Sequence, residues 1–198
     1  MNSPFELHAF SSRTYTAAEC ITFGNKCLSL SDLDAEMQHH KGVSHIMVCD
    51  PTQEEFDQFV AQYADQYASI YFFHMRKVKD LSLLSTLQHV QWLLIHNAHA
   101  DALWDMQGNL ALRGLMVSES KKTIYDLEPL VAAPSLDEVI LLSSMDRKYA
   151  TRSLSPLLQC SHLQRVMIEL NTESKDFRPE DYVHLDAFQY QVDRKRNF

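Results

Sequence analysis

The sequence predicts an α/β fold, a solenoid of about eight strand–helix units of roughly 24 residues, with one parallel sheet on its concave face. Three observations support this prediction. Short apolar segments recur along the chain, and the number of residues between them varies little. The stretches between them have a helical pattern of apolar residues. The segments are HIMVCD, SIYFFHM, WLLIHN, GLMVSES, VILLSS and RVMIELN.

Two of these segments define the repeat. LDEVILLSS and LQRVMIELN both read L-x-x-L-x-L, followed by two residues and then Ser or Asn. The same register gives first positions at Val43, Tyr67, Val90, Leu112, Leu136 and Leu163, which are 24, 23, 22, 24 and 27 residues apart by subtraction. Ala18 lies 25 residues before this series and Leu185 lies 22 residues after it. All 24 template positions of the eight units are apolar, as a buried strand face requires.

Helices are predicted between the strands. Residues 52–65 place Phe56, Phe59, Val60 and Tyr63 on one helical face, and Thr52 and Glu55 have the spacing of a capping box. Three further apolar stripes follow: Val78, Leu81, Leu84 and Leu87; Ile124, Leu127, Leu130 and Val131; and Leu154, Leu157 and Leu158, with Ser153 as a cap. Each unit is therefore expected to contain one helix of two to three turns.

A step of about 24 residues is too short for a doubly wound sheet, whose β-α-β units need about 30 or more. The segment with Leu163, Val166, Ile168 and Asn171 fits the template L-x-x-L-x-L-x-x-N, and the chain resembles the leucine-rich-repeat superfamily over about residues 18–193. The family's Asn position is Asn at Asn171 alone, which implies a divergent and irregular member with uneven curvature. In the other units this position holds Lys26, Pro51, Met75, Ala98, Ser120, Ser144 and Asp193. An α/β sandwich with helices on both sheet faces is the alternative fold.

The resemblance implies a single solenoid domain over residues 1–198. Residues 1–17 are expected to form an N-terminal cap, residues 18–171 the repeats, and residues 172–198 a C-terminal capping unit.

The resemblance also implies which side chains the sheet exposes, because the template residues point into the core and the residues between them point outward. The middle outward positions are Thr22, Met47, Tyr71, Leu94, Met116, Ile140, Met167 and Gln189. An apolar stripe of this size is typical of an interaction site. The predicted partner-binding residues are Met47, Tyr71, Phe73, Trp92, Leu94, Met116, Ile140 and Met167. The alternative is that residues 1–17 or 172–184 cover this face.

Composition and charge narrow the possible partners. The chain has 18 Lys and Arg against 26 Asp and Glu, a formal charge of -8 and a pI near 5.6, which argues against nucleic acid and anionic membranes as partners. Many of the acids fall in predicted helices and turns rather than on the concave face: Asp32, Asp34, Glu36, Glu54, Glu55, Asp57 and Asp65. No signal peptide, membrane span or C-x-x-C pair is visible, so we expect a cytoplasmic protein with reduced thiols.

Catalytic chemistry has little support in the sequence. No phosphate-binding loop, dinucleotide fingerprint or G-x-S-x-G elbow occurs, and we predict no catalytic residues and no cofactor. His74, His96 and His99 fall in turns after predicted strands, near Asp50, Asp101 and Glu119, and give a weak alternative metal site. Cys49 and His45 would lie about 13 Å apart on one strand, which excludes a hydrogen-bonded pair. Cys20, on the neighbouring strand, is the nearer partner for one or the other.

The leading hypothesis is a non-enzymatic interaction module whose apolar concave face binds another protein or a second copy of the chain as a homodimer. The resemblance permits an inhibitor- or immunity-like role. The alternative is a small metal-dependent or hydrolytic enzyme with a His-rich site at the carboxyl edge of the strands.

Overall fold

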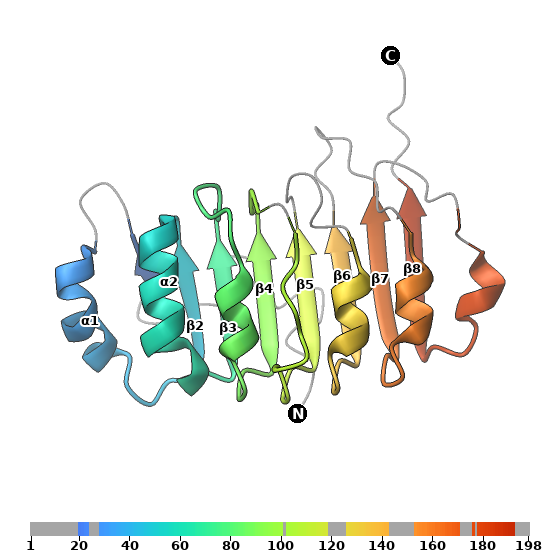
Figure 1. Cartoon of the computed structure of the whole chain (residues 1–198), viewed down its shortest axis with the longest axis horizontal. Coiled ribbons are helices and arrows are strands. Elements are labelled where there is room, and N and C mark those ends of the chain that lie inside the picture. The colour runs from blue at the N-terminus through green and yellow to red at the C-terminus, as the bar shows by residue number, and fades with distance from the viewer. Residues whose placement is uncertain are drawn as a thin grey trace, which may run out of the picture.

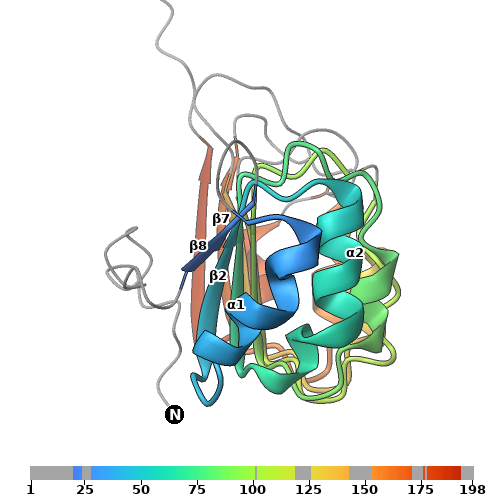
Figure 2. The ribbon, with the colours of Figure 1, turned by 90° about the vertical axis from the view of Figure 1, so that its left-hand side faces the viewer.

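The computed structural model describes residues 20–23, 28–100, 102–118, 126–142, 153–170, 176 and 178–192. Eight strands form one parallel sheet in which every strand lies beside its neighbours in the sequence. The strands are β1 Cys20–Thr22, β2 His45–Cys49, β3 Ser69–Phe73, β4 Trp92–His96, β5 Gly114–Ser118, β6 Glu138–Leu142, β7 Arg165–Leu170 and β8 Ala187–Val192. The helical segments of the described chain lie on one side of the sheet (Figures 1 and 2). The predicted solenoid is therefore confirmed, and the alternative of a sandwich with helices on both sides is wrong.

The pairing of the strands confirms the predicted register from β2 to β8. Ile46, Ile70, Leu93 and Leu115 lie side by side in consecutive strands, and each is fully buried against the helical side. Because side chains alternate along a strand, the residues between these positions face the opposite side of the sheet.

The register of β1 differs from the prediction by two residues. Thr22 was expected beside Met47, but Cys20 pairs with Met47 and Thr22 pairs with Cys49. A shift of two residues keeps every side chain on its predicted face, so Ile21 stays in the core. An apolar pattern with a period of two cannot distinguish these two registers.

Two α-helices cover the first strands: α1 Leu33–His39 and α2 Gln53–Gln62. The predicted capping box is present at the start of α2. The Glu55 backbone N–H donates to the Thr52 hydroxyl over 3.3 Å, and the Glu55 carboxylate accepts from the Thr52 backbone N–H over 2.7 Å. Phe56, Phe59 and Val60 are buried against the sheet, as the helical spacing predicted.

The replacement Thr52→Ala is expected to lower the free energy of unfolding by about 1 kcal/mol, because it removes the side-chain acceptor of this cap. Glu55→Gln is the control, since glutamine retains an acceptor for the Thr52 backbone N–H. Urea denaturation measures both changes. A loss in Glu55→Gln as large as the loss in Thr52→Ala would contradict this expectation, because it would show that the charge of Glu55 contributes as much as the Thr52 acceptor.

Helices of two to three turns were predicted after β3 as well, but four of the five units there contain 3-10 segments, and the described residues between β4 and β5 contain no helical segment. The prediction is therefore wrong for these units. These segments are η4 Ser82–Thr86, η6 Glu128–Ala132, η7 Ser155–Gln159 and η8 Pro179–Tyr182; the shorter η2 Leu30–Asp32 and η3 Ala64–Gln66 adjoin α1 and α2. The stripe of Val78, Leu81, Leu84 and Leu87 is buried and repeats every three residues, which is the period of a 3-10 helix. Val131 and Leu158 each follow a buried leucine and are exposed, since a turn of three residues has no room for them on its inner side.

Ser153 was predicted to cap a helix, and Ile124 was predicted to lie on a helical apolar stripe. Ser153 does accept from the Ser155 backbone N–H, over 3.0 Å, just before η7. Ile124 lies outside the described residues.

The connection between β4 and β5 is organised by a buried amide that the sequence analysis missed. Asn109 is 1 % exposed, and its Nδ2 donates to the carbonyl oxygens of Leu84 and Leu87 over 2.7 and 2.8 Å. Its Oδ1 accepts from Trp104 Nε1 over 2.7 Å. The preceding Gly108 permits this close approach, because a Cβ at that position would lie 2.4 Å from the Ser85 carbonyl oxygen. Asn109 thus ties one unit to the unit before it.

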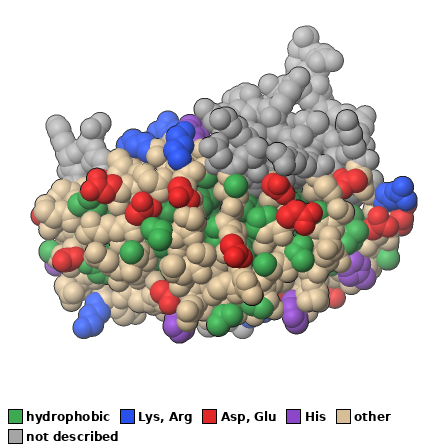
Figure 3. All heavy atoms as spheres, in the orientation of Figure 1, with side chains coloured by type: hydrophobic (Ala, Val, Ile, Leu, Met, Phe, Trp, Pro, Cys, Tyr) green, Lys and Arg blue, Asp and Glu red, His purple; other side chains and the backbone are tan. Residues whose placement is uncertain are grey.

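Several acidic side chains lie in the helices of the helix-bearing face, as predicted. Asp34 and Glu36 lie in α1, and Glu54, Glu55 and Asp57 lie in α2. Figure 3 shows acidic groups dispersed over this face among apolar and uncharged ones. None of the described helices is long and apolar enough to cross a membrane.

Candidate functional site

The side of the sheet that faces away from the helices carries a continuous row of apolar side chains. Met47, Tyr71, Leu94, Met116, Ile140 and Met167 are direct neighbours in six consecutive strands. We call the surface formed by this row and its flanking residues Phe73, Trp92 and Leu142 the outer sheet face. The row ends beside Cys20 in β1 and beside Gln189 in β8.

The exposure of this face is uneven. Trp92 and Leu94 are each 1 % exposed and Ile140 is 5 % exposed, and the three form a buried cluster separate from the main core. Tyr71, Met116, Leu142 and Met167 pack against this cluster and remain half-buried. The prediction of an exposed stripe is therefore wrong for Trp92, Leu94 and Ile140. The other five predicted residues, Met47, Tyr71, Phe73, Met116 and Met167, are half-buried.

Whether the chain's own ends cover this face was left open by the sequence. Residues 1–17 lie outside the described residues, and so do 171–175 and 177. Of the C-terminal unit, β8 pairs with β7 and extends the sheet, while η8 contributes Tyr182 to the main core.

A charged cluster borders the outer sheet face at the amino ends of β5, β6 and β7. Arg113 Nε donates to Asp137 Oδ2 over 3.0 Å, and its Nη2 contacts the same oxygen. Arg165 Nη2 lies 3.3 Å from Glu138 Oε2 and 3.6 Å from Asp137 Oδ1. The two carboxylate side chains are only 11 % and 10 % exposed, so the two arginines offset a charge that would be costly to bury unpaired.

The same cluster contacts the apolar row. The Arg113 guanidinium lies 5.7 Å from the centre of the Trp92 ring, a cation–π distance. Glu138 and Arg165 lie two residues before Ile140 and Met167, so the alternation along the strand puts them on the same face. The sequence gave no sign of Arg113 or Asp137, which precede their strands. Their pairing depends on residues 24 positions apart in the sequence.

The outer sheet face is hollowed over β6, β7 and β8. A depression of about 490 Å³ opens there, with Ile140, Met167 and Ala187 among its apolar lining residues. Glu138, Arg165 and Asp186 supply its charges. Because Arg165 already pairs with Glu138, the lining retains a net negative charge from Asp186.

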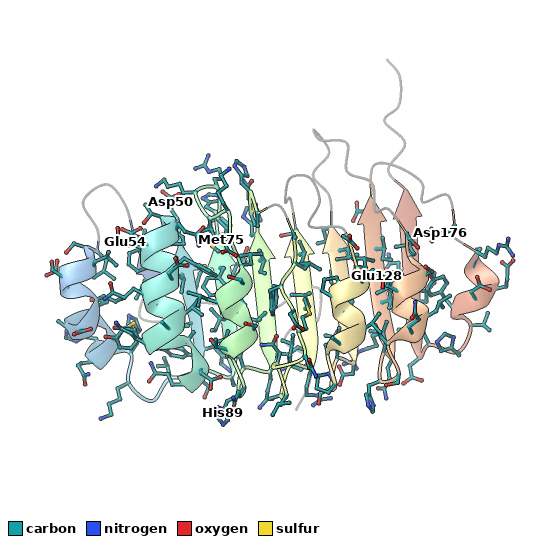
Figure 4. The ribbon with its side chains drawn as sticks, in the orientation of Figure 1. Asp50, Glu54, Met75, His89, Glu128 and Asp176 are labelled. Atoms are coloured by element: carbon teal, nitrogen blue, oxygen red, sulfur yellow. The ribbon has the colours of Figure 1, made fainter. Side chains whose placement is uncertain are left out.

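Polar residues at the carboxyl edge of the strands adopt a left-handed backbone conformation. Asp50, His74 and Asn97 follow the ends of β2, β3 and β4, and each has a positive φ, of 51°, 57° and 57°. Asp50 is labelled at this edge in Figure 4. Asp, Asn and His are the residues other than glycine that adopt this left-handed conformation most readily. The backbone N–H groups of Asp50 and Asn97 donate to the carbonyl oxygens of Phe73 and Ser118, which continues the sheet into the turn.

Two of the three histidines of the alternative metal site, His74 and His96, stack on a neighbouring ring. The Phe73 ring stacks on His74 and on His96, with centroid distances of 3.8 and 4.6 Å. His96 Nδ1 also accepts from the His74 backbone N–H over 3.4 Å. Within the described part of the chain, no three His, Cys, Asp or Glu side chains are grouped to hold a metal ion. Asp101 and Glu119 lie outside the described residues. These contacts give no support to the metal-dependent or hydrolytic alternative, in which His74, His96 and His99 would act together.

Comparisons with known proteins support the fold. No protein-family model matches the sequence, and no curated protein matches it. Among solved structures, internalin C2 of Listeria monocytogenes is similar with a TM-score of 0.57 and 13 % sequence identity, over 79 % of this chain and 74 % of that chain. A second internalin of the same organism, InlF, has a TM-score of 0.49 and 16 % identity over 75 % of this chain and 48 % of its own.

Internalins are leucine-rich-repeat proteins. With its eight-stranded parallel sheet and its template residues in the core, this chain has a leucine-rich-repeat fold of a divergent kind.

Proposed function

We propose that this protein is a non-enzymatic interaction module that binds a protein partner through the outer sheet face. The observation that supports this proposal is the unbroken apolar row across six adjacent strands, from Met47 to Met167. Contiguous apolar surface of this extent is typical of protein interaction sites. Methionine and aromatic side chains are also enriched in the centres of interfaces.

The uneven burial of this face suits binding. Trp92, Leu94 and Ile140 form a packed base that is already ordered before a partner arrives. The half-buried side chains of Tyr71 and Met116 lie on that base, so a partner would remove their remaining surface from water at little entropic cost.

The hollow over β6–β8 is the proposed anchor point. Its apolar lining and its negative charge favour a partner side chain with a long aliphatic stem and a cationic end, as in lysine or arginine. A partner with such a residue at the centre of an apolar patch would complement this chain, which has a formal charge of -8.

The proposal extends to the identity of the occupant, the biological role and the compartment. A second copy of the chain is the alternative occupant of the face, and the inhibitor- or immunity-like role remains what the resemblance permits. We also place the protein in the cytoplasm, consistent with the free thiols of Cys20, Cys49 and Cys160.

The double variant Tyr71→Asp, Met167→Asp tests the proposal, because it adds charge at two half-buried positions near the ends of the apolar row. We expect partner retention from native lysate, or self-association measured by light scattering, to fall at least about tenfold. The matched control is Leu110→Asp, Val183→Asp, which changes two exposed apolar residues outside the outer sheet face, 58 % and 82 % exposed.

Far-ultraviolet circular dichroism verifies that both double variants remain folded. If the variant Tyr71→Asp, Met167→Asp still retained the partner while the control variant lost it, the binding site would lie outside the outer sheet face. That result would contradict the proposal.

A further inference from the structure

Two cysteines from neighbouring strands lie side by side at the β1 end of the outer sheet face. Cys20 belongs to β1 and Cys49 is the last residue of β2. Their Sγ atoms are 3.5 Å apart, within hydrogen-bonding distance for sulfur, although 29 positions separate them in the sequence. Both are half-buried, so both sulfurs sit at the boundary between protein and solvent.

The surroundings leave Cys20 open to small molecules. A depression of about 260 Å³ beside β1 is lined by Cys20, Thr22, Leu28 and Glu36. The Thr22 hydroxyl oxygen lies 3.6 Å from Cys20 Sγ. A small polar oxidant could therefore reach this sulfur without moving the main core.

The two thiols differ in acidity because they share one hydrogen bond. That bond, in which the Cys49 thiol donates, lowers the pKa of Cys20 to about 6, with smaller contributions from Thr22 and from the charge of His40. The same bond and burial raise the pKa of Cys49 above its usual range, and the charge of Asp50 acts in the same direction. The shared bond therefore favours the thiolate of Cys20 and the protonated thiol of Cys49. The carboxylate of Glu36 also lines the depression, and its Oε1 lies 3.2 Å from His40 Nε2.

We propose that Cys20 and Cys49 form a peroxide-sensitive dithiol whose oxidation to a disulfide ties β1 to β2. In the first step the Cys20 sulfur attacks one oxygen of hydrogen peroxide, the O–O bond breaks, and hydroxide leaves and is protonated to water, which gives a sulfenic acid. In the second step the Cys49 sulfur attacks the Cys20 sulfur and the S–O bond breaks. The hydroxyl leaves with the proton of Cys49 as a second water. The two sulfurs together lose two electrons, and one peroxide gains them.

The position of β1 makes this closure feasible. A disulfide bond is about 2.05 Å long, so the two sulfurs must approach by about 1.5 Å from their separation of 3.5 Å. β1 has three residues, and β2 is its one neighbour among the described strands. On its other side the Leu28 backbone N–H donates to the Thr22 carbonyl oxygen over 3.0 Å, so a shift of β1 has to carry Leu28 with it. Oxidation would fix this edge of the sheet next to Met47, the first residue of the apolar row.

Peptide mapping after treatment with stoichiometric hydrogen peroxide tests the pairing. Trypsin separates the four cysteines, which fall in residues 14–26 for Cys20, 27–41 for Cys27, 42–76 for Cys49 and 153–165 for Cys160. We expect the disulfide to join residues 14–26 to residues 42–76. Cys27 lies outside the described residues, and a bond to Cys27, a bond between two chains or no disulfide at all would each overturn the proposal.

The rate of alkylation by iodoacetamide tests the shared hydrogen bond independently. Cys20 is expected to reach half of its maximal rate near pH 6, because its thiolate forms as the pH rises through that value. Cys49→Ala removes the donor and should raise this midpoint by at least one pH unit, and Cys49→Ser, which keeps a donor, should raise it less. Cys160→Ala is the control. Burial raises the pKa of Cys160 to about 11, and its removal should leave the Cys20 profile unchanged. A Cys20 midpoint that is the same in wild type and in Cys49→Ala would contradict the paired site.

Discussion

Replacing Asn109 with alanine is expected to lower the free energy of unfolding by about 3–5 kcal/mol, since several buried polar groups lose their partners at once. The carbonyl oxygens of Leu84 and Leu87 would lose the Nδ2 donor, and Trp104 Nε1 would lose its acceptor. Water cannot easily replace the amide, because Asn109 is 1 % exposed and Trp104 is 3 % exposed. Urea denaturation followed by tryptophan fluorescence measures the change, and Trp104 reports on the site directly.

Gln107→Ala is the matched control for this prediction. It removes another side-chain amide two residues away, at a position that is exposed. Its effect should stay within about 0.5 kcal/mol of wild type. If Asn109→Ala proved as mild as Gln107→Ala, the buried amide would not be what joins the units on either side of β4.

Replacing Phe72 with alanine is the second change with a large expected effect, a loss of about 3–5 kcal/mol. Phe72 is fully buried, and its ring meets the edges of Phe56 and Phe59 at centroid distances of 5.2 and 6.1 Å. The cavity left by the ring would lie between β3 and α2, where rigid elements on both sides limit collapse.

Phe73→Ala is the control, because it removes the same ring one residue along the chain. Phe73 faces the outer sheet face, is half-buried and stacks on His74 and His96, so its loss should cost less than about 1.5 kcal/mol. In the proposed function, Phe73→Ala should also weaken partner binding while the protein stays folded. Similar losses of stability in Phe72→Ala and Phe73→Ala would contradict the alternation of core and outer positions along β3.

Much of the sheet could be predicted from the sequence, because its apolar alternation is strong and local. Residues such as Ile70 and Phe72 have the period of two that a strand buried on one face requires, and their spacing to the next unit sets the strand order. The capping box of Thr52 and Glu55 was equally readable, since it depends on two residues three positions apart.

The features that the sequence did not reveal depend on contacts between units. The helical stripes after β3 were ambiguous, because leucines three and four residues apart fit an α-helix and a 3-10 turn alike. Val131 and Leu158 show that the shorter turn forms. The partners of Arg113 and Asn109 lie in other units, so no local pattern marked either residue.

The candidate site was predicted in outline. The row from Met47 to Met167 follows from the strand register, but the near-complete burial of Trp92 and Leu94 is not encoded in that register. The sequence left open whether Cys20 lies nearer to Cys49 or to His45, and the structure places it beside Cys49. The geometry of this pair arises from the two-residue shift of β1, which a periodic pattern does not encode.

The 3-10 segments affect the shape of the partner surface that can bind to this protein. An α-helix is about 10 Å wide, whereas neighbouring strands are about 4.8 Å apart, and this mismatch forces a solenoid with a helix in every unit to bend. The narrower turns η4, η6 and η7 reduce the mismatch over the middle and far strands, so the sheet there bends less. A binding partner would not need a convex surface that fills a deep groove. It would need a broad and shallow patch about 24 Å across, the span of six strands.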